Sequence, residues 1–153
     1  MSLTSRLEAD LKVAMRSRDE LQRDTIRLVL SALRNQQIEN RAPLENQQEL
    51  SVVQREAKRR RENAVEYERV QRPDMAEKER TELRIMEMYL PQPLDITQVR
   101  AHVLRAINST GASTQKEMGR VMAVVLPELK GRADGTVVSQ MVRDVLRERE
   151  AST

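Results

Sequence analysis

Tyr89-Leu90-Pro91-Gln92-Pro93-Leu94 interrupts a sequence that has helical patterning on both sides. Proline has no amide hydrogen to donate and disfavours helix at the residue before it, so two prolines two residues apart end a helical region. They also stiffen the link, since proline-rich segments are extended and semi-rigid. We therefore predict two domains that meet at a hinge of limited freedom: an N-terminal helical domain of residues 1–90 and a three-helix domain of residues 95–150.

Upstream of this segment the sequence predicts four helices. Residues 46–71 contain neither glycine nor proline and predict one long helix, which Arg72-Pro73-Asp74 ends. Apolar residues recur every three or four positions in the other stretches, as in helices that cover one side of a core. Asp19 and Asp74 each have the spacing of a capping box. The predicted helices cover residues 3–17, 19–40, 46–71 and 74–89.

Downstream of the prolines the sequence predicts three shorter helices. Asp95 and Thr114 have the capping-box spacing and begin the first two. Lys130-Gly131-Arg132-Ala133-Asp134-Gly135 predicts a tight turn, in which Asp134 caps a last helix. Gly119 costs about 1 kcal/mol relative to alanine inside a helix, which suggests that another backbone passes close to it, either a neighbouring helix or an RNA backbone. Pro127 predicts a kink or a tightened last turn.

The composition favours an all-α protein. The sequence contains eight methionines and two tyrosines but no phenylalanine or tryptophan. Strands usually recruit aromatic and β-branched residues, whereas Leu, Met, Ala, Glu, Arg and Gln favour helices. Charged residues of both signs make up 33% of the chain, which is typical of long, solvated helices with narrow apolar stripes. The net charge of +3 is compatible with an acidic partner but does not require one.

No catalytic residue, metal site or cofactor is expected. The absence of cysteine excludes a disulfide framework, a thiolate zinc site and a cysteine nucleophile. His102 has no second histidine with which to share a metal, so we interpret it as a structural or surface residue. No apolar run is long enough to span a bilayer, and the first residues lack a hydrophobic signal core. Because Glu8 and Asp10 also argue against a transit peptide, we expect a cytoplasmic protein without a membrane partner.

Two groups of basic residues are candidate RNA contacts. Residues 55–61 are the densest positive stretch, but consecutive basic residues spread around a helix and glutamates dilute them. We interpret this stretch as a solvated face, in which i,i+4 pairs such as Glu56 with Arg60 support an exposed helix. The second group lies around the predicted turn, where basic residues outnumber acidic ones. Its candidate nucleic-acid-binding residues are Lys116, Arg120, Lys130 and Arg132.

Two motifs carry a family resemblance. Met118-Gly119-Arg120-Val121-Met122, followed by Lys130-Gly131-Arg132-Ala133-Asp134-Gly135, resembles the signature of the YqeY-like proteins, also grouped as GatB/YqeY. The resemblance extends to residues 89–94 and, more loosely, to Ile26-Arg27 and the helix around Lys58, so it covers nearly the whole chain. It implies an all-α fold in two parts, with long helices first and a small three-helix tail second.

The resemblance also implies a relation to RNA. The family shares its tail with the B subunit of the glutamine-dependent enzyme that amidates mischarged Glu-tRNA or Asp-tRNA, and there the tail contacts tRNA. Two departures limit what carries over. Asp134 stands where that tail commonly has asparagine, and its charge weakens a phosphate contact at the turn. Pro127 alters the surface beside the turn.

Three functions remain open. The leading hypothesis is a module that binds tRNA or another structured RNA without catalysis; lacking phenylalanine and tryptophan, it would read backbone and shape through lysine and arginine. The second is participation in carbon–nitrogen ligase chemistry with glutamine as amido-nitrogen donor, as the family kinship implies. The third is a helical adaptor that binds a protein partner through the long helix of residues 46–71.

Overall fold

The computed structural model describes residues 1–152, which form helices and no strand. The prediction of an all-α fold is confirmed. The chain divides into two compact units, Met1–Leu90 and Pro91–Thr153, and the boundary between them falls inside the proline segment. None of the described helices combines the length and the apolarity that crossing a bilayer requires.

The first two helices of the first unit begin with side-chain caps. The side chains of Ser2 and Asp19 accept the backbone amides of Ser5 and Gln22 at 3.1 Å each, which satisfies donors that a helix leaves free at its start. Glu45 opens the long helix through a capping box with Gln48 that the sequence analysis did not identify. The helices are α1 (Leu3–Ser17), α2 (Glu20–Asn40), α3 (Asn46–Arg69) and α4 (Pro73–Glu87).

The start of α4 differs from its prediction. Asp74 does not cap this helix: Arg72 occupies the capping position and Pro73 is the first helical residue. Proline suits that position because its fixed φ is helical and its missing amide hydrogen would be unpaired there in any case. The Asp74 carboxylate instead pairs with the Arg72 guanidinium at 3.3 Å. The capping box predicted from Asp74 and Glu77 is therefore wrong.

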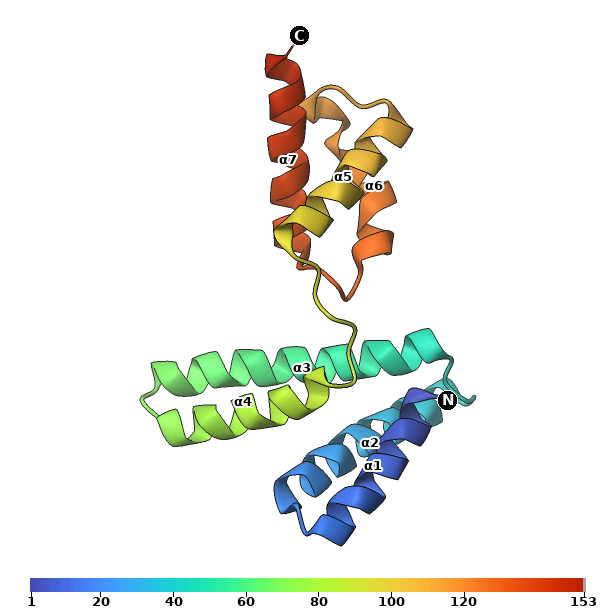
Figure 1. The fold of residues 1–153 in the computed structure, drawn as a ribbon, viewed down its shortest axis with the longest axis vertical. Coiled ribbons are helices and arrows are strands. Elements are labelled where there is room, and N and C mark those ends of the chain that lie inside the picture. Colours follow the sequence, from blue (N-terminus) through green and yellow to red (C-terminus); the bar gives the residue numbers. More distant parts are fainter. Residues whose placement is uncertain (153) are drawn as a thin grey trace. The chain divides into compact units, whose positions relative to one another are not determined.

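Aliphatic side chains from all four helices form the core of the first unit. In Figure 1, α1 runs beside α2 and α3 runs beside α4. Tyr89, just after α4, closes this core: its ring is buried, its hydroxyl donates to the Asp10 carboxylate, and the Arg6 guanidinium lies 5.2 Å from the ring centroid. The buried core residues are Leu7, Ile26, Val29, Leu33, Val52, Val53, Ala57, Met86 and Tyr89.

The interface between α3 and α4 also contains buried charges. Arg60 of α3 is 8% exposed; its Nη1 lies 2.7 Å from Glu56 Oε2, and its Nε lies 3.3 Å from Oε2 of Glu82 on α4. Glu79 is a third carboxylate near the same guanidinium, at 4.0 Å. The interpretation of Glu56 and Arg60 as an exposed pair is therefore wrong. An i,i+4 pair has the same spacing in the sequence whether its side of the helix is buried or exposed. Only the packing of α4 against α3 shows that the side with Glu56 and Arg60 is buried.

The second unit is a three-helix bundle in which every helix contacts the other two. Asp95 accepts the amide of Gln98 at 2.8 Å and Gln98 accepts the amide of Asp95 at 3.0 Å, which confirms the predicted capping box. Valines, Ala106, Ile107, Leu129 and Leu146 fill its core. The helices are α5 (Ile96–Thr110), a short 3-10 turn (Gln115–Glu117), α6 (Met118–Leu129) and α7 (Gly135–Ala151).

Two predictions about α6 need correction. Thr114 does not cap it: the 3-10 turn intervenes, and the Thr114 hydroxyl donates to Glu117 Oε1 at 3.4 Å instead of accepting an amide. Gly119 is exposed, and in the described part of the chain nothing lies within 4 Å of the position a Cβ would take. No neighbouring backbone therefore explains this glycine. The helix continues through Pro127 to Leu129.

We predict that Arg60→Met lowers the free energy of unfolding by about 3 kcal/mol, because it leaves the Glu56 and Glu82 carboxylates buried without their cation. Urea unfolding followed by circular dichroism measures the change. The matched control is Arg61→Met on the exposed side of α3, which should change stability by less than about 0.5 kcal/mol. Equal effects of the two substitutions would contradict the role assigned to Arg60.

We predict a specific loss of stability at high pH from Tyr89. Burial, followed by the hydrogen bond to Asp10, raises the pKa of Tyr89 above its ordinary value. Above about pH 10 the unfolded chain releases the phenolic proton that the folded chain retains, so stability falls as pH rises. Between about pH 8 and pH 11, urea unfolding should show a larger loss for the natural protein than for Tyr89→Phe. The pH dependence is measured for both proteins, so the groups that they share cancel from the comparison.

Candidate nucleic-acid interface of the second unit

The turn between α6 and α7 is held in place on three sides. The Leu129 carbonyl accepts the amides of Arg132 at 2.9 Å and Ala133 at 3.1 Å, and Gly131 has a φ of 79°, which favours glycine. The Arg132 carbonyl accepts the amide of Leu94 at 2.8 Å, which joins the turn to the segment before α5. The Asp134 carboxylate accepts the amide of Thr136 at 2.7 Å and begins α7. The predicted N-cap at Asp134 is confirmed.

Lys130 and Arg132 project from this fixed turn. Both residues are exposed, and neither side chain has a partner among the described residues. Beside them, Leu126, Pro127, Leu129 and Ala133 line a mostly apolar hollow of about 560 Å³. The turn therefore presents two unpaired cations on a backbone whose conformation is already set.

Lys116 and Arg120 lie at the other end of α6. Lys116 is exposed and has no side-chain partner in the described chain, whereas the Arg120 guanidinium donates to the Thr110 carbonyl at the end of α5 and lies 3.6 Å from Glu117. The twelve residues of α6 rise about 18 Å at 1.5 Å per residue. The structure therefore brings the four candidate residues together as two pairs, at opposite ends of one helix.

Part of the basic stretch of residues 55–61 in the first unit is occupied by contacts within the chain. Arg60 is buried, Arg59 lies 3.7 Å from Glu56, and Arg55 donates to Gln36 at 3.3 Å. Among the exposed members of the stretch, Lys58 and Arg61 have no partner in the part of the chain that the structure describes.

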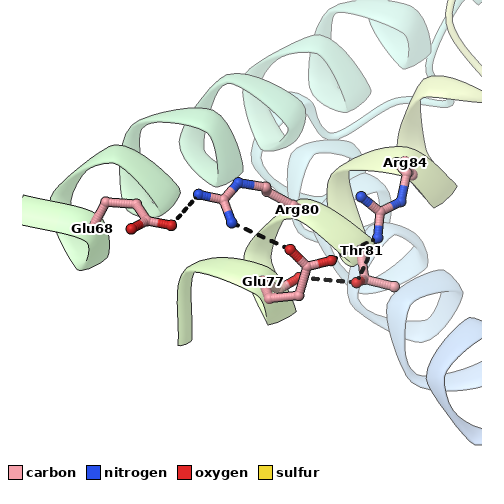
Figure 2. Close-up of polar contacts among 5 residues, drawn as sticks. All are labelled: Glu68, Glu77, Arg80, Thr81 and Arg84. Atoms are coloured by element: carbon pink, nitrogen blue, oxygen red, sulfur yellow. Dashed lines mark hydrogen bonds and ion pairs between the residues drawn. The ribbon is translucent and has the colours of Figure 1, made fainter. Parts of the chain in front are cut away.

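The arginines on α4 are occupied as well. Figure 2 shows Arg80 between Glu68 of α3 and Glu77, with Arg84 donating to Glu77 at 3.1 Å and to Thr81 at 3.0 Å. The guanidinium groups of Arg84 and Arg80 hold the pKa of Glu77 below its ordinary value. Such exposed pairs contribute little to stability, but they leave fewer free cations for a partner.

The described residues contain no group of three or more histidine, cysteine, aspartate or glutamate side chains that could hold a metal ion. The candidate interface consists of cations beside an apolar hollow, and guanidinium and ammonium groups are the side chains that pair with anions.

The comparison with known families assigns the chain to one of them. Residues 4–146 match the family described as Yqey-like protein. The chain is a member of the YqeY-like family. Because the match covers both units, the family defines the long-helix part and the three-helix part together.

Curated relatives of this YqeY-like protein share one name, "Altered inheritance of mitochondria protein 41, mitochondrial". The relative from Clavispora lusitaniae is 31% identical over 96% of this chain and 89% of that protein. The relative from Pyrenophora tritici-repentis is 29% identical over 92% of this chain and 79% of that protein. The relative from Saccharomyces cerevisiae (strain YJM789) is 27% identical over 79% of this chain and 69% of that protein.

The expected cytoplasmic location is wrong, because these relatives are named as mitochondrial proteins. The structure shows what the first residues of the chain do. Leu7 is fully buried and Asp10 bonds to Tyr89, so this segment is a helix of the fold and its composition reflects packing rather than targeting. Asp10, one of the two acidic residues weighed against a transit peptide, therefore has a structural role in the first unit.

We predict that Asp134→Ala lowers the free energy of unfolding by about 1 kcal/mol, because the Thr136 amide loses its acceptor. Asp134→Asn should be close to neutral, since an amide oxygen accepts the same hydrogen bond. Thermal unfolding of the three proteins compares them. An asparagine variant as damaged as the alanine variant would show that the carboxylate has a function other than capping.

Proposed function

We propose that the chain binds structured RNA, with tRNA as the first candidate, and carries out no chemistry of its own. The observation that carries the proposal is the pair Lys130 and Arg132: two exposed, unpartnered cations on a turn that the Leu94 amide and the Asp134 cap hold in place. Because the turn is fixed before binding, little conformational entropy is lost when a phosphate is bound.

The composition supports recognition of RNA by backbone and shape. The chain has no phenylalanine or tryptophan on which unpaired bases would stack, so lysine and arginine contacts to phosphates provide the affinity. The separation of about 18 Å between the two pairs along α6 suits a folded RNA, which presents phosphates at more than one place. The resemblance of this unit to the tail of the amidotransferase B subunit supports the same reading.

Kinship to the amidotransferase does not require amidation by this chain. We propose that the shared part is RNA contact, because the sequence contains no cysteine nucleophile and no glycine-rich nucleotide loop. Participation in carbon–nitrogen ligase chemistry, if it occurs, takes place in a complex whose other subunits supply the reactive groups.

The test is a double charge reversal, Lys130→Glu with Arg132→Glu, in the full chain. A tRNA transcript is titrated at several salt concentrations and binding is followed by fluorescence anisotropy. Four phosphate contacts predict a log–log salt slope of roughly −3 to −4 for the natural protein, and loss of two should reduce it to about half. Affinity should fall at least about tenfold. Circular dichroism checks that the helices persist.

The control reverses two exposed, unpartnered charges of the first unit, Lys58→Glu with Arg61→Glu. It should bind tRNA as tightly as the natural protein, within about twofold. Loss of binding in this control but not in the turn variant would move the interface to α3. If the natural protein binds no tRNA, or neither variant changes binding, RNA recognition by the turn is rejected and a protein adaptor becomes the better interpretation.

A further inference from the structure

Another hollow lies between α5 and α6 and contains the sequence's single histidine. Its volume is about 450 Å³. On α6 it lies between the two pairs of candidate cations, because Arg120, Val124 and Glu128 follow one another at intervals of four residues on one helix face. The residues that line it are His102, Arg105, Ala106, Ser109, Val124 and Glu128.

Two charged groups compete for one atom of His102. Its Nδ1 lies 3.1 Å from Arg105 Nη2 and 3.3 Å from Glu128 Oε2. A guanidinium only donates hydrogen bonds and an ionised carboxylate only accepts them, whereas a ring nitrogen does one or the other. When Nδ1 is unprotonated it accepts from Arg105, and Glu128 has no bond to the ring. When Nδ1 is protonated it donates to Glu128, and Arg105 has no bond to the ring.

An anion in the hollow would satisfy both groups. It would accept hydrogen bonds from the Arg105 guanidinium, which is exposed and has no other partner among the described residues. The imidazole of His102 would then donate from Nδ1 to Glu128. The Ser109 hydroxyl donates to the Ala106 carbonyl at 3.0 Å, so its hydrogen is already used and the main donor to the anion is the arginine.

We propose that the α5–α6 hollow binds a phosphate group through Arg105, with His102 and Glu128 paired behind it. Guanidinium and phosphate match as a two-pronged pair, and the hollow accepts a group of that size. If the phosphate belongs to an RNA, it lies between the two cation pairs at the ends of α6. The inference that the ligand is an RNA phosphate rests on the proposed function. A free phosphate compound offers the same chemistry, and the experiment separates the two sources.

The single histidine provides a direct probe. The imidazole resonances of His102 are followed by NMR while the full chain is titrated with inorganic phosphate and, separately, with the tRNA transcript. Both titrations should shift them, and Arg105→Gln should abolish the shift with phosphate. The same variant should bind tRNA about three- to tenfold more weakly, with a salt slope smaller by about one.

The direction in which Glu128→Gln changes the affinity for phosphate distinguishes an anion site from the alternatives. This substitution keeps the side chain's shape but removes the negative charge that repels a phosphate. Phosphate and tRNA should bind about two- to fivefold more tightly. A purely structural Glu128 would leave binding unchanged, and a site for a cation would not bind phosphate at all. The controls are Arg147→Gln and Asp144→Asn, which make the same charge changes on α7 outside the hollow.

The outcomes separate this inference from the proposed function. If the natural protein binds tRNA but Arg105→Gln and Glu128→Gln behave like their controls, the phosphate site is overturned and RNA binding stands. If phosphate shifts the His102 resonances and tRNA does not bind, the site stands with a free phosphate compound as its ligand and the proposed function fails. If neither ligand shifts the resonances or binds, both are overturned.

Discussion

The buried guanidinium of Arg60 is the constraint on which the first unit depends. The small side chains of Ala57 and Ala64 on α3 and of Ala76 on α4 are buried. The bonds from Arg60 to Glu56 and Glu82 fit one register only, because the donor and both acceptors must meet where water does not replace them. That register also places Met86 and Tyr89 in the core against α1 and α2. The charges therefore specify the arrangement, and the aliphatic core supplies most of the stability.

The second unit places residues that fix the backbone within a few positions of residues whose side chains are free. In the turn before α7, Leu94, Leu129 and Asp134 contribute the bonds that fix the backbone, while Lys130 and Arg132 have free side chains. Along α6 a similar division recurs: Val121, Val125 and Leu129 are buried, and the adjacent exposed side carries Arg120, Val124 and Glu128. A partner could thus bind the exposed side without disturbing the core.

The sequence predicted what local patterns determine and missed what distant contacts determine. The caps at Asp19, Asp95 and Asp134 were predictable because a capping residue and its amide lie within three positions. The burial of Arg60 was not, since Glu82 is 22 residues away and nothing near Arg60 indicates that α4 covers it. Likewise His102 gains Glu128 as a neighbour only when α5 and α6 pack, 26 residues apart. The candidate cations were found by charge and already divided between the turn and the helix before it, and the structure adds the length of α6 that separates the two pairs.

The hydrogen bond between Asp10 and Tyr89 has a consequence for synthesis of the chain. These residues are 79 positions apart and lie near the two ends of the first unit, so α1 makes this contact only after almost the whole unit has been translated. A nascent chain carries α1 and α2 as an incomplete pair while α3 and α4 are still being made, at a synthesis rate of about 5–20 residues per second. During those seconds the apolar side of α1 has no Tyr89 to cover it. A chaperone near the ribosomal exit would meet this protein first through that uncovered helix.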